Sequence, residues 1–155
     1  MDLSTLQKNP VSGKPNVNIQ AQQLASRMDP NKIIMTDMMK RGMGDQAIPF
    51  ILQLTQEAGT PKVRIVRHNN TLGVLSREGE HQGILSIFTA DDPIRTQENV
   101  NYIYHALKAG GYKHLMVHVD NSNDSKMHEV AGKSVGGQMT IHKLPTDGFM
   151  IDWRL

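Results

Sequence analysis

The chain has 155 residues, the size of a single domain, and 38% of them are hydrophobic. It contains no cysteine, which excludes disulfide bonds, thiol catalysis and cysteine-bound zinc. Its net charge of +2 is too small to indicate nucleic acid or an anionic membrane as a partner by itself. The sequence has neither a membrane-spanning apolar run nor a signal-peptide core, so we expect a cytoplasmic protein, or one exported without a cleaved signal peptide.

The first part of the chain predicts an arm followed by a domain. Residues 1–17 place prolines and a glycine among polar residues, which indicates a flexible N-terminal arm, and residues 18–155 are expected to form one domain. Residues 18–29 have helical spacing, and the Asp-Pro pair at their end is expected to stop that helix. Residues 31–41 fit a short strand or a helix, and the pattern does not decide between them.

A helix and a β-meander are expected next. Residues 45–58 have an apolar side and a capping aspartate, so they predict a helix. Asn69 and Asn70 suit a two-residue turn, because asparagine tolerates a positive φ angle. The turn lies within an expected antiparallel meander of three strands, at residues 62–68, 71–76 and 83–89.

Residues 97–120 give the clearest pattern in the chain. Apolar residues at i, i+3, i+4 and i+7 predict a helix over residues 97–109, and two glycines follow it. Residues 113–120 then alternate: Leu115, Val117 and Val119 share one face of a strand. A helix that leads into a strand through a glycine turn is half of an α/β unit.

The rest of the chain completes a predicted α+β fold. A short helix at residues 125–134 and a strand at residues 138–144 would form a parallel strand–helix–strand crossover with the strand before them. The tail alternates apolar residues, which predicts an edge strand or a docked arm. We therefore expect a mixed sheet of about five strands, a meander plus the crossover, with the helices mainly on one face.

Strand alternation predicts a face rich in histidine. If the apolar residues of each strand face the helices, several polar side chains share the other face and form a candidate ligand or partner surface: Arg64, His68, His114, His118, Asp120 and His142. The same pattern also fits a partly solvated face whose histidines have no chemical role.

Spacing narrows the metal ligands that this face could supply. His114 and His118 lie four residues apart, about 13 Å along a strand, which is too far for both to bind one ion. His118 and Asp120, with His142 as a third ligand, are a more plausible metal set. No spacing in the sequence selects a nucleophile or a cofactor.

Residues 71–144 resemble a known family. The order of elements, the run from Gly110 to Lys113, the apolar strand at residues 115–119 and the segment at residues 121–126 are similar to the large polyvalent protein-associated domain. This small α/β accessory domain occurs in conjugative relaxases and other mobile-element proteins. The resemblance implies a non-catalytic accessory role and transfers no functional residues.

Two functions follow from these patterns. The first is a non-enzymatic protein-interaction or accessory module, from a bacterial mobile-element or secreted-effector system as the resemblance implies, with another protein as its partner. Arg64 and Arg67 also leave nucleic acid open, although few aromatic residues accompany them, and no membrane is expected. The alternative is a small metal- or histidine-dependent hydrolase that uses His118, Asp120 and His142.

Overall fold

The computed structural model describes residues 27–155, in which four helices and six strands are found. The predicted arm at residues 1–17, and nearly all of the predicted helix at residues 18–29, lie outside the described residues. None of the described helices is long and apolar enough to cross a membrane.

The first two helices are α3 (Pro30–Lys40) and α4 (Gly44–Glu57). The Asp-Pro pair that was expected to end a helix begins one. The Asp29 carboxylate accepts a hydrogen bond from the Asn31 amide at 2.8 Å, and Pro30 occupies the first helical position, where its missing N–H is not needed. The segment at residues 31–41, which the sequence left undecided, is therefore helical up to Lys40.

Six strands form one mixed sheet in the order β1-β2-β3-β4-β6-β5. The strands are β1 (Val63–His68), β2 (Thr71–Arg77), β3 (Gln82–Thr89), β4 (His114–Val119), β5 (Gln138–Lys143) and β6 (Phe149–Arg154). Strands β1, β2 and β3 are the predicted antiparallel meander, and Asn69 adopts the positive φ (51°) that its turn requires.

Two crossovers complete the predicted α+β fold. Helix α5 (Pro93–Ala109) connects the parallel neighbours β3 and β4, and helix α6 (Ser122–Val135) connects β4 to β5. Strand β6 lies between β4 and β5 and is antiparallel to both, so β4 and β5 run parallel without touching. The tail is thus an internal strand, because its fully buried Ile151 and Trp153 favour the interior over the edge.

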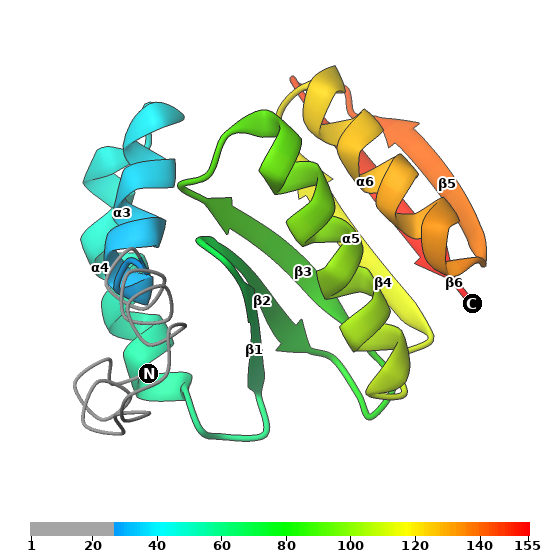
Figure 1. Ribbon diagram of the computed structural model, residues 1–155, viewed down its shortest axis with the longest axis horizontal. Helices are drawn as coiled ribbons and strands as arrows, with labels where there is room; N and C mark the ends of the chain where they lie inside the picture. Colours follow the sequence, from blue (N-terminus) through cyan, green and yellow to red (C-terminus); the bar gives the residue numbers. More distant parts are fainter. Residues whose placement is uncertain (1–26) are drawn as a thin grey trace, which may run out of the picture.

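The main hydrophobic core lies between the sheet and helices α5 and α6, which cover one face (Figure 1). The face of α5 predicted from spacing is the one that packs, with Ile103, Tyr104 and Leu107 fully buried. Gly73 on β2 lets the helix approach, since a Cβ there would lie 2.7 Å from Cγ2 of Ile103.

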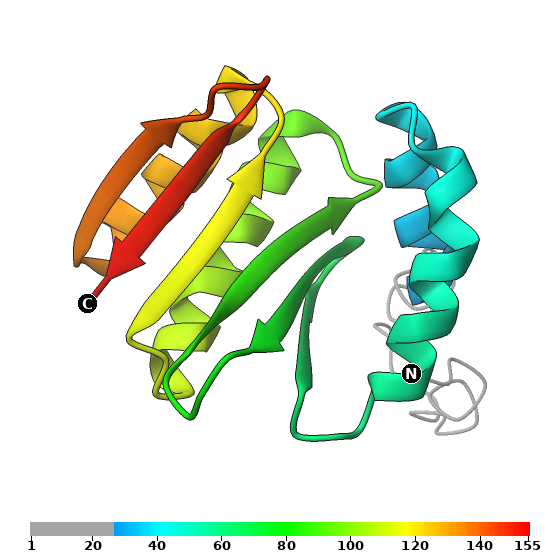
Figure 2. The ribbon, with the colours of Figure 1, turned by 180° about the vertical axis from the view of Figure 1, so that it is seen from behind.

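A second core lies on the opposite face, where α3 and α4 pack against β2 and β3. Figure 2 shows these two helices beside the meander end of the sheet, away from β5 and β6. Helix α4 was expected on the same face as the other helices. The sequence of β2 explains this difference, because the strand has buried apolar residues on both of its faces. Leu72 and Val74 lie on one face and Leu75 lies on the other, so helices are needed on both sides.

A buried polar pair lies inside the main core. The Tyr104 hydroxyl and Nδ1 of His128 are 2.7 Å apart, and the Tyr104 ring meets Trp153 edge to face at 5.6 Å. Burial, helped by the positive charge of Arg41, lowers the pKa of His128 to about 3. His128 is therefore neutral at physiological pH, and burial raises the pKa of Tyr104.

Truncation of the central helix should test the main core. We expect Leu107→Ala to lower the free energy of unfolding by about 2–5 kcal/mol, because it leaves a cavity at the helix–sheet junction. Ile94→Ala on the same helix is the matched control, since Ile94 is 78% exposed, and it should change stability by less than about 0.5 kcal/mol. Urea titration measures both; similar losses would contradict the assigned face.

The neutral histidine should make the fold acid-sensitive. Its pKa in the fold lies below the ordinary 6.5, so its contribution to stability is complete above pH 6.5 and is lost as the pH falls from there toward 3. Between pH 6.5 and pH 5, the free energy of unfolding measured by urea titration should fall further in wild type than in His128→Gln. We expect the two decreases to differ by about 2 kcal/mol. Glutamine keeps a donor and an acceptor for the Tyr104 hydroxyl, and equal pH dependence in both proteins would refute the assignment.

Candidate functional site

The neighbouring strands β3 and β4 separate toward their carboxyl ends. Their parallel pairing covers four residue pairs and stops at Leu85 and Val117. Beyond this point the last four residues of β3 pair only with β2, and the last two of β4 pair only with β6. Figure 2 shows the two strands diverging. Backbone groups along the two inner edges of this split therefore lack a ladder partner across it. The Thr89 amide donates instead to the Asp37 carboxylate at 3.2 Å, so the groups nearer to Leu85 and Val117 are the ones that a ligand can reach.

A cavity of about 320 Å³ opens at the split, between the sheet and the first two helices. Helices α3 and α4 form one wall, and the ends of β3 and β4 form the other. Its lining residues are Met38, Arg41, Met43, Gln46, Phe50, Ser86, Ile87, Phe88, His118 and Asp120. The cavity is mainly apolar, with its charged groups gathered at the β4 side.

Arg41 is the centre of those charges. Its Nε donates a hydrogen bond to the Asp37 carboxylate at 3.0 Å, and Nη1 lies 3.5 Å from carboxylate oxygens of both Asp120 and Asp124. One guanidinium thus joins the end of α3 to the end of β4 and the first turn of α6. Three carboxylates on one cation leave the cluster with a net negative charge.

Asp37 is the buried member of this cluster, with 4% of its surface exposed. Desolvation raises the pKa of its carboxyl above 3.8, although the hydrogen bond from Arg41 opposes the rise. Its second oxygen accepts a hydrogen bond from the Thr89 amide at 3.2 Å. Asp37 therefore ties helix α3 to the last residue of β3, at the edge of the split.

His118 is the titratable group that faces the cavity from β4. Its Nδ1 lies 3.9 Å from the Asp120 carboxylate, and both side chains are half exposed. The turn between β5 and β6 passes beside the ring, since a Cβ at Gly148 would lie 3.4 Å from Nε2. The imidazole is thus held between a carboxylate and a backbone turn, with access to the cavity.

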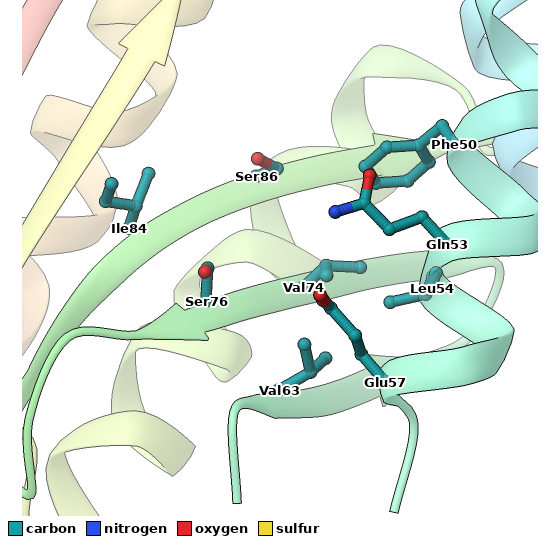
Figure 3. A pocket seen from close by; sticks show the side chains of 9 residues that line it. All are labelled: Phe50, Gln53, Leu54, Glu57, Val63, Val74, Ser76, Ile84 and Ser86. Atoms are coloured by element: carbon teal, nitrogen blue, oxygen red, sulfur yellow. The ribbon is translucent and has the colours of Figure 1, made fainter. Parts of the chain in front are cut away.

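A second cavity, of about 170 Å³, lies along α4 and shares Phe50 and Ser86 with the first. Figure 3 shows Gln53 and Glu57 reaching from α4 across the sheet, with Val74 on the facing strand. The two cavities together make a cleft between α4 and the sheet that runs into the split. Its walls are largely apolar, with a few polar groups.

The structure places the predicted histidines of β4 and β5 on one face, as the alternation indicated. His118 and His142 both lie opposite Met150 of β6, so they are two strands apart, about 10 Å. His114 instead contacts Asp152, with Nε2 at 2.9 Å from the carboxylate. The described residues contain no group of three histidine or acidic side chains that could hold a metal ion, so His118, Asp120 and His142 are not brought together as ligands.

Arg64 and His68 lie on the other face of the sheet. In the pairing of β1 with β2, Arg64 lies opposite Leu75 and His68 lies opposite Thr71, and both partners face helix α5. The His68 ring also stacks on Tyr102 of α5, with ring centroids 3.9 Å apart. The expectation that they share the histidine face does not hold, because α3 and α4 cover the opposite side of the meander. The use of the six predicted residues as a partner surface stays a prediction.

Sequence reasoning found His118 and Asp120 but missed Arg41, Asp37 and Gly148. The two α3 residues were hidden because that segment was read as strand or helix. Read as a helix, Asp37 and Arg41 form an i, i+4 pair, which is a local signal for an ion pair. Nothing local connects Gly148 with His118, since they meet only when β6 inserts beside β4.

Comparison with known proteins identifies the class of fold. No protein-family model matches the sequence, and no curated protein matches it either. The structure is similar to a protein of Desulfovibrio desulfuricans assigned to the GNAT family of acetyltransferases, with a TM-score of 0.52, 12% identity, and coverage of 81% of this chain and 91% of that one.

Two further solved structures have the same likeness. A probable acetyltransferase from Staphylococcus epidermidis has a TM-score of 0.50 and 17% identity, with 80% of this chain and 88% of that chain covered. An aminoglycoside 6'-N-acetyltransferase from Enterococcus faecium has a TM-score of 0.50 and 11% identity, with 91% and 92% covered. At these identities the likeness shows a GNAT-like fold.

These comparisons correct the earlier functional predictions. The resemblance to the polyvalent accessory domain is wrong, because the structural neighbours are acetyltransferases. The expected non-enzymatic module from a mobile-element or effector system depended on that resemblance and is wrong with it. The same structural neighbours also contradict the alternative prediction of a metal- or histidine-dependent hydrolase. The patterns that suggested the accessory domain belong to any helix–glycine–strand passage, which many folds contain.

Acetyl-CoA, the donor that such a fold implies, carries a diphosphate, which would favour a helix N-terminus at the carboxyl edge of the strands. Helix α5 begins there, but its Arg95 amide already donates to the Asp92 carboxylate at 2.9 Å. Pro93 offers no N–H, and the Asp91 carboxylate accepts from Asn99 at 2.8 Å. Two carboxylates therefore stand where the phosphates would bind.

Helix α6 also begins at this edge and is similarly closed to anions. The Asn121 side chain caps the Asp124 amide at 2.8 Å, and the Asp124 carboxylate lies in the first turn. The nearby cation, Arg41, is already bound by three carboxylates. The residues present at this edge do not fit a diphosphate.

Loss of the central cation should destabilise the cleft. We expect Arg41→Met to lower the free energy of unfolding by about 1–3 kcal/mol near neutral pH, because it leaves the buried Asp37 carboxylate without its charged donor. Arg95→Met, which loses only a solvent-exposed pair, is the control.

The loss should shrink as the pH falls from neutral toward the acid range. The fold raises the pKa of Asp37, so the folded protein takes up its proton before the unfolded chain does, and a protonated Asp37 needs no cation. Urea titrations across this range measure the difference between wild type and variant. A loss that does not change with pH would contradict the role given to Asp37.

Proposed function

We propose that this chain is an enzyme that transfers an acyl group from a thioester to a primary amine, in the cleft where β3 and β4 separate. The early end of the β3–β4 pairing carries the proposal, because it leaves backbone groups free beside a histidine in a fold shared with acetyltransferases. The proposal replaces the interaction module that the sequence suggested.

The split supplies the place for the acyl group. A thioester carbonyl that lies between the inner edges of β3 and β4 can accept hydrogen bonds from backbone N–H groups that lack ladder partners. Such fixed donors stabilise the negative charge that develops on the carbonyl oxygen as the amine attacks. They are held in place by the strands, so they need little reorganisation during the reaction.

His118 is the proposed general base. The amine nitrogen attacks the carbonyl carbon, a C–N bond forms, and the imidazole accepts the proton that the nitrogen loses. The C–S bond then breaks, and the carrier leaves as a thiolate that takes up a proton. The Asp120 carboxylate lies 3.9 Å from Nδ1, on the side of the ring that faces the end of β4.

The cleft along α4 is the proposed site of the acceptor. Phe50, Leu54 and Val74 offer apolar contacts to the carbon chain of an amine, and Gln53 and Glu57 offer polar ones (Figure 3). Because this cavity shares Phe50 and Ser86 with the cavity at the split, an amine seated there can reach the acyl group.

Acyl transfer by His118 variants tests the proposal. Purified protein is incubated with an acetyl thioester and a panel of amines, including a diamine and a lysine peptide, and the acetylated product is measured by mass spectrometry. We expect His118→Gln to lower kcat about 10²–10⁴-fold without loss of folding. His105→Gln, an exposed histidine on the opposite face, should leave kcat unchanged. Absence of transfer to any amine, or unchanged activity in His118→Gln, would overturn the proposal.

A further inference from the structure

The charge at the carboxyl edge of the strands distinguishes between classes of acyl donor. Four carboxylates gather there from the two helix starts and the end of β4: Asp91, Asp92, Asp120 and Asp124. Arg41 is the cation that lines the cavity, and its guanidinium is already engaged by carboxylates. Arg95 and Arg67 also lie at this edge, beside Asp92 and Asn70. The carboxylates still outnumber these arginines, so an anionic carrier would have to enter a region of net negative charge.

Several other basic residues of the described chain lie at the opposite edge of the sheet, whereas Arg67 and Arg95 lie at the carboxyl edge, where they contact Asn70 and Asp92. Arg64 and Arg77 lie 5.7 and 6.0 Å from the ring centroid of Tyr112, which lies two positions before the start of β4. Lys108, in the last turn of α5, donates to the Val135 carbonyl at 2.8 Å. These cations stand at the amino ends of β3 and β4, where the strands are paired, so they cannot serve a carrier that enters at the split.

The carboxylates at the start of α5 are fixed by their bonding. Asp91 accepts hydrogen bonds from the Asn70 amide at 3.0 Å and from the side chain of the fully buried Asn99 at 2.8 Å. Asn99 also donates to the Thr71 hydroxyl at 2.9 Å. Because buried partners hold Asp91, this carboxylate cannot swing away to admit a phosphate.

We infer that the acyl donor of this chain is a thioester whose carrier bears no diphosphate, and that coenzyme A thioesters are disfavoured by charge. The inference rests on the proposed acyl transfer and names the donor class for it. The donor places its acyl group and a short neutral stem in the split, where the backbone groups are free. The bonds made and broken are those of thioester aminolysis: C–N forms, C–S breaks and the thiol leaves with a proton.

The test compares two donors that share the acetyl thioester and differ in the carrier. Acetyl-CoA carries the diphosphate, and S-acetyl-N-acetylcysteamine ends before it. With the same amine acceptor, we expect the kcat/KM values for the two donors to agree within about threefold, or the value for the short donor to be higher. Added salt screens the carboxylates, so it should raise kcat/KM for acetyl-CoA relative to that for the short donor. A preference for acetyl-CoA greater than about tenfold, corresponding to 1.4 kcal/mol, would overturn the inference.

A charge variant provides a second readout. Asp92→Ser keeps a side chain that caps α5 but removes one negative charge, so it should raise kcat/KM for acetyl-CoA about two- to fivefold and leave that for the short donor unchanged. Glu80→Gln, in the exposed turn between β2 and β3 at the other edge of the sheet, is the matched control and should change neither value. An equal effect of Asp92→Ser on both donors would contradict the assignment.

Direct binding separates this inference from the proposed function. If neither thioester supports transfer, the proposed function fails, but calorimetry with coenzyme A alone still tests the charge argument. We expect no heat of binding at about 1 mM coenzyme A, the concentration range in which weak ligands are detected. A Kd below about 100 μM that tightens in Asp92→Ser would show a diphosphate site at this edge and would overturn the inference.

Discussion

The separation of β3 from β4 after four residue pairs is the constraint on which the rest of the molecule depends. Each strand end is held from its outer side. Thr89, at the end of β3, contacts Thr71 and Thr96 through hydroxyl hydrogen bonds of 2.8 and 2.9 Å. Val119, at the end of β4, pairs with Phe149 of β6. Because both ends already have partners on their outer sides, they can diverge without leaving either strand unsupported.

Helices α3 and α4 turn this split into a cleft. They pack on the face of the meander opposite α5, and they place Arg41, at the end of α3, and Phe50, in the middle of α4, at the mouth of the split. The hydrogen bond from the Thr89 amide to Asp37 ties them to β3, while the contact of Arg41 with Asp120 reaches across to β4. Arg41 therefore bridges the two sides of the opening. The residues that determine the shape of the opening also determine its local charge.

Proteins that share a fold need not bind the same ligand. The GNAT-like arrangement of strands and helices provides an opening between two parallel strands, which is a property of the backbone. What enters that opening depends on the side chains at its edge, and here these are Asp91, Asp92, Asp120 and Asp124. The fold and the charge at its edge thus give independent information, the first about the opening and the second about the charge of a ligand that could enter it.

The sequence by itself determined the local elements: the meander, the central helix with its buried face, and the alternation that places His118 and Asp120 near each other. These follow from contacts within a few residues, which periodicity and turn chemistry report. Only the tertiary structure decided that β6 inserts beside β4, that α4 packs on the opposite face, and that Arg41 meets Asp120 and Asp124. These depend on pairings between distant segments, for which a single sequence has no local signal, because strands of similar apolar pattern can exchange places at little cost in burial.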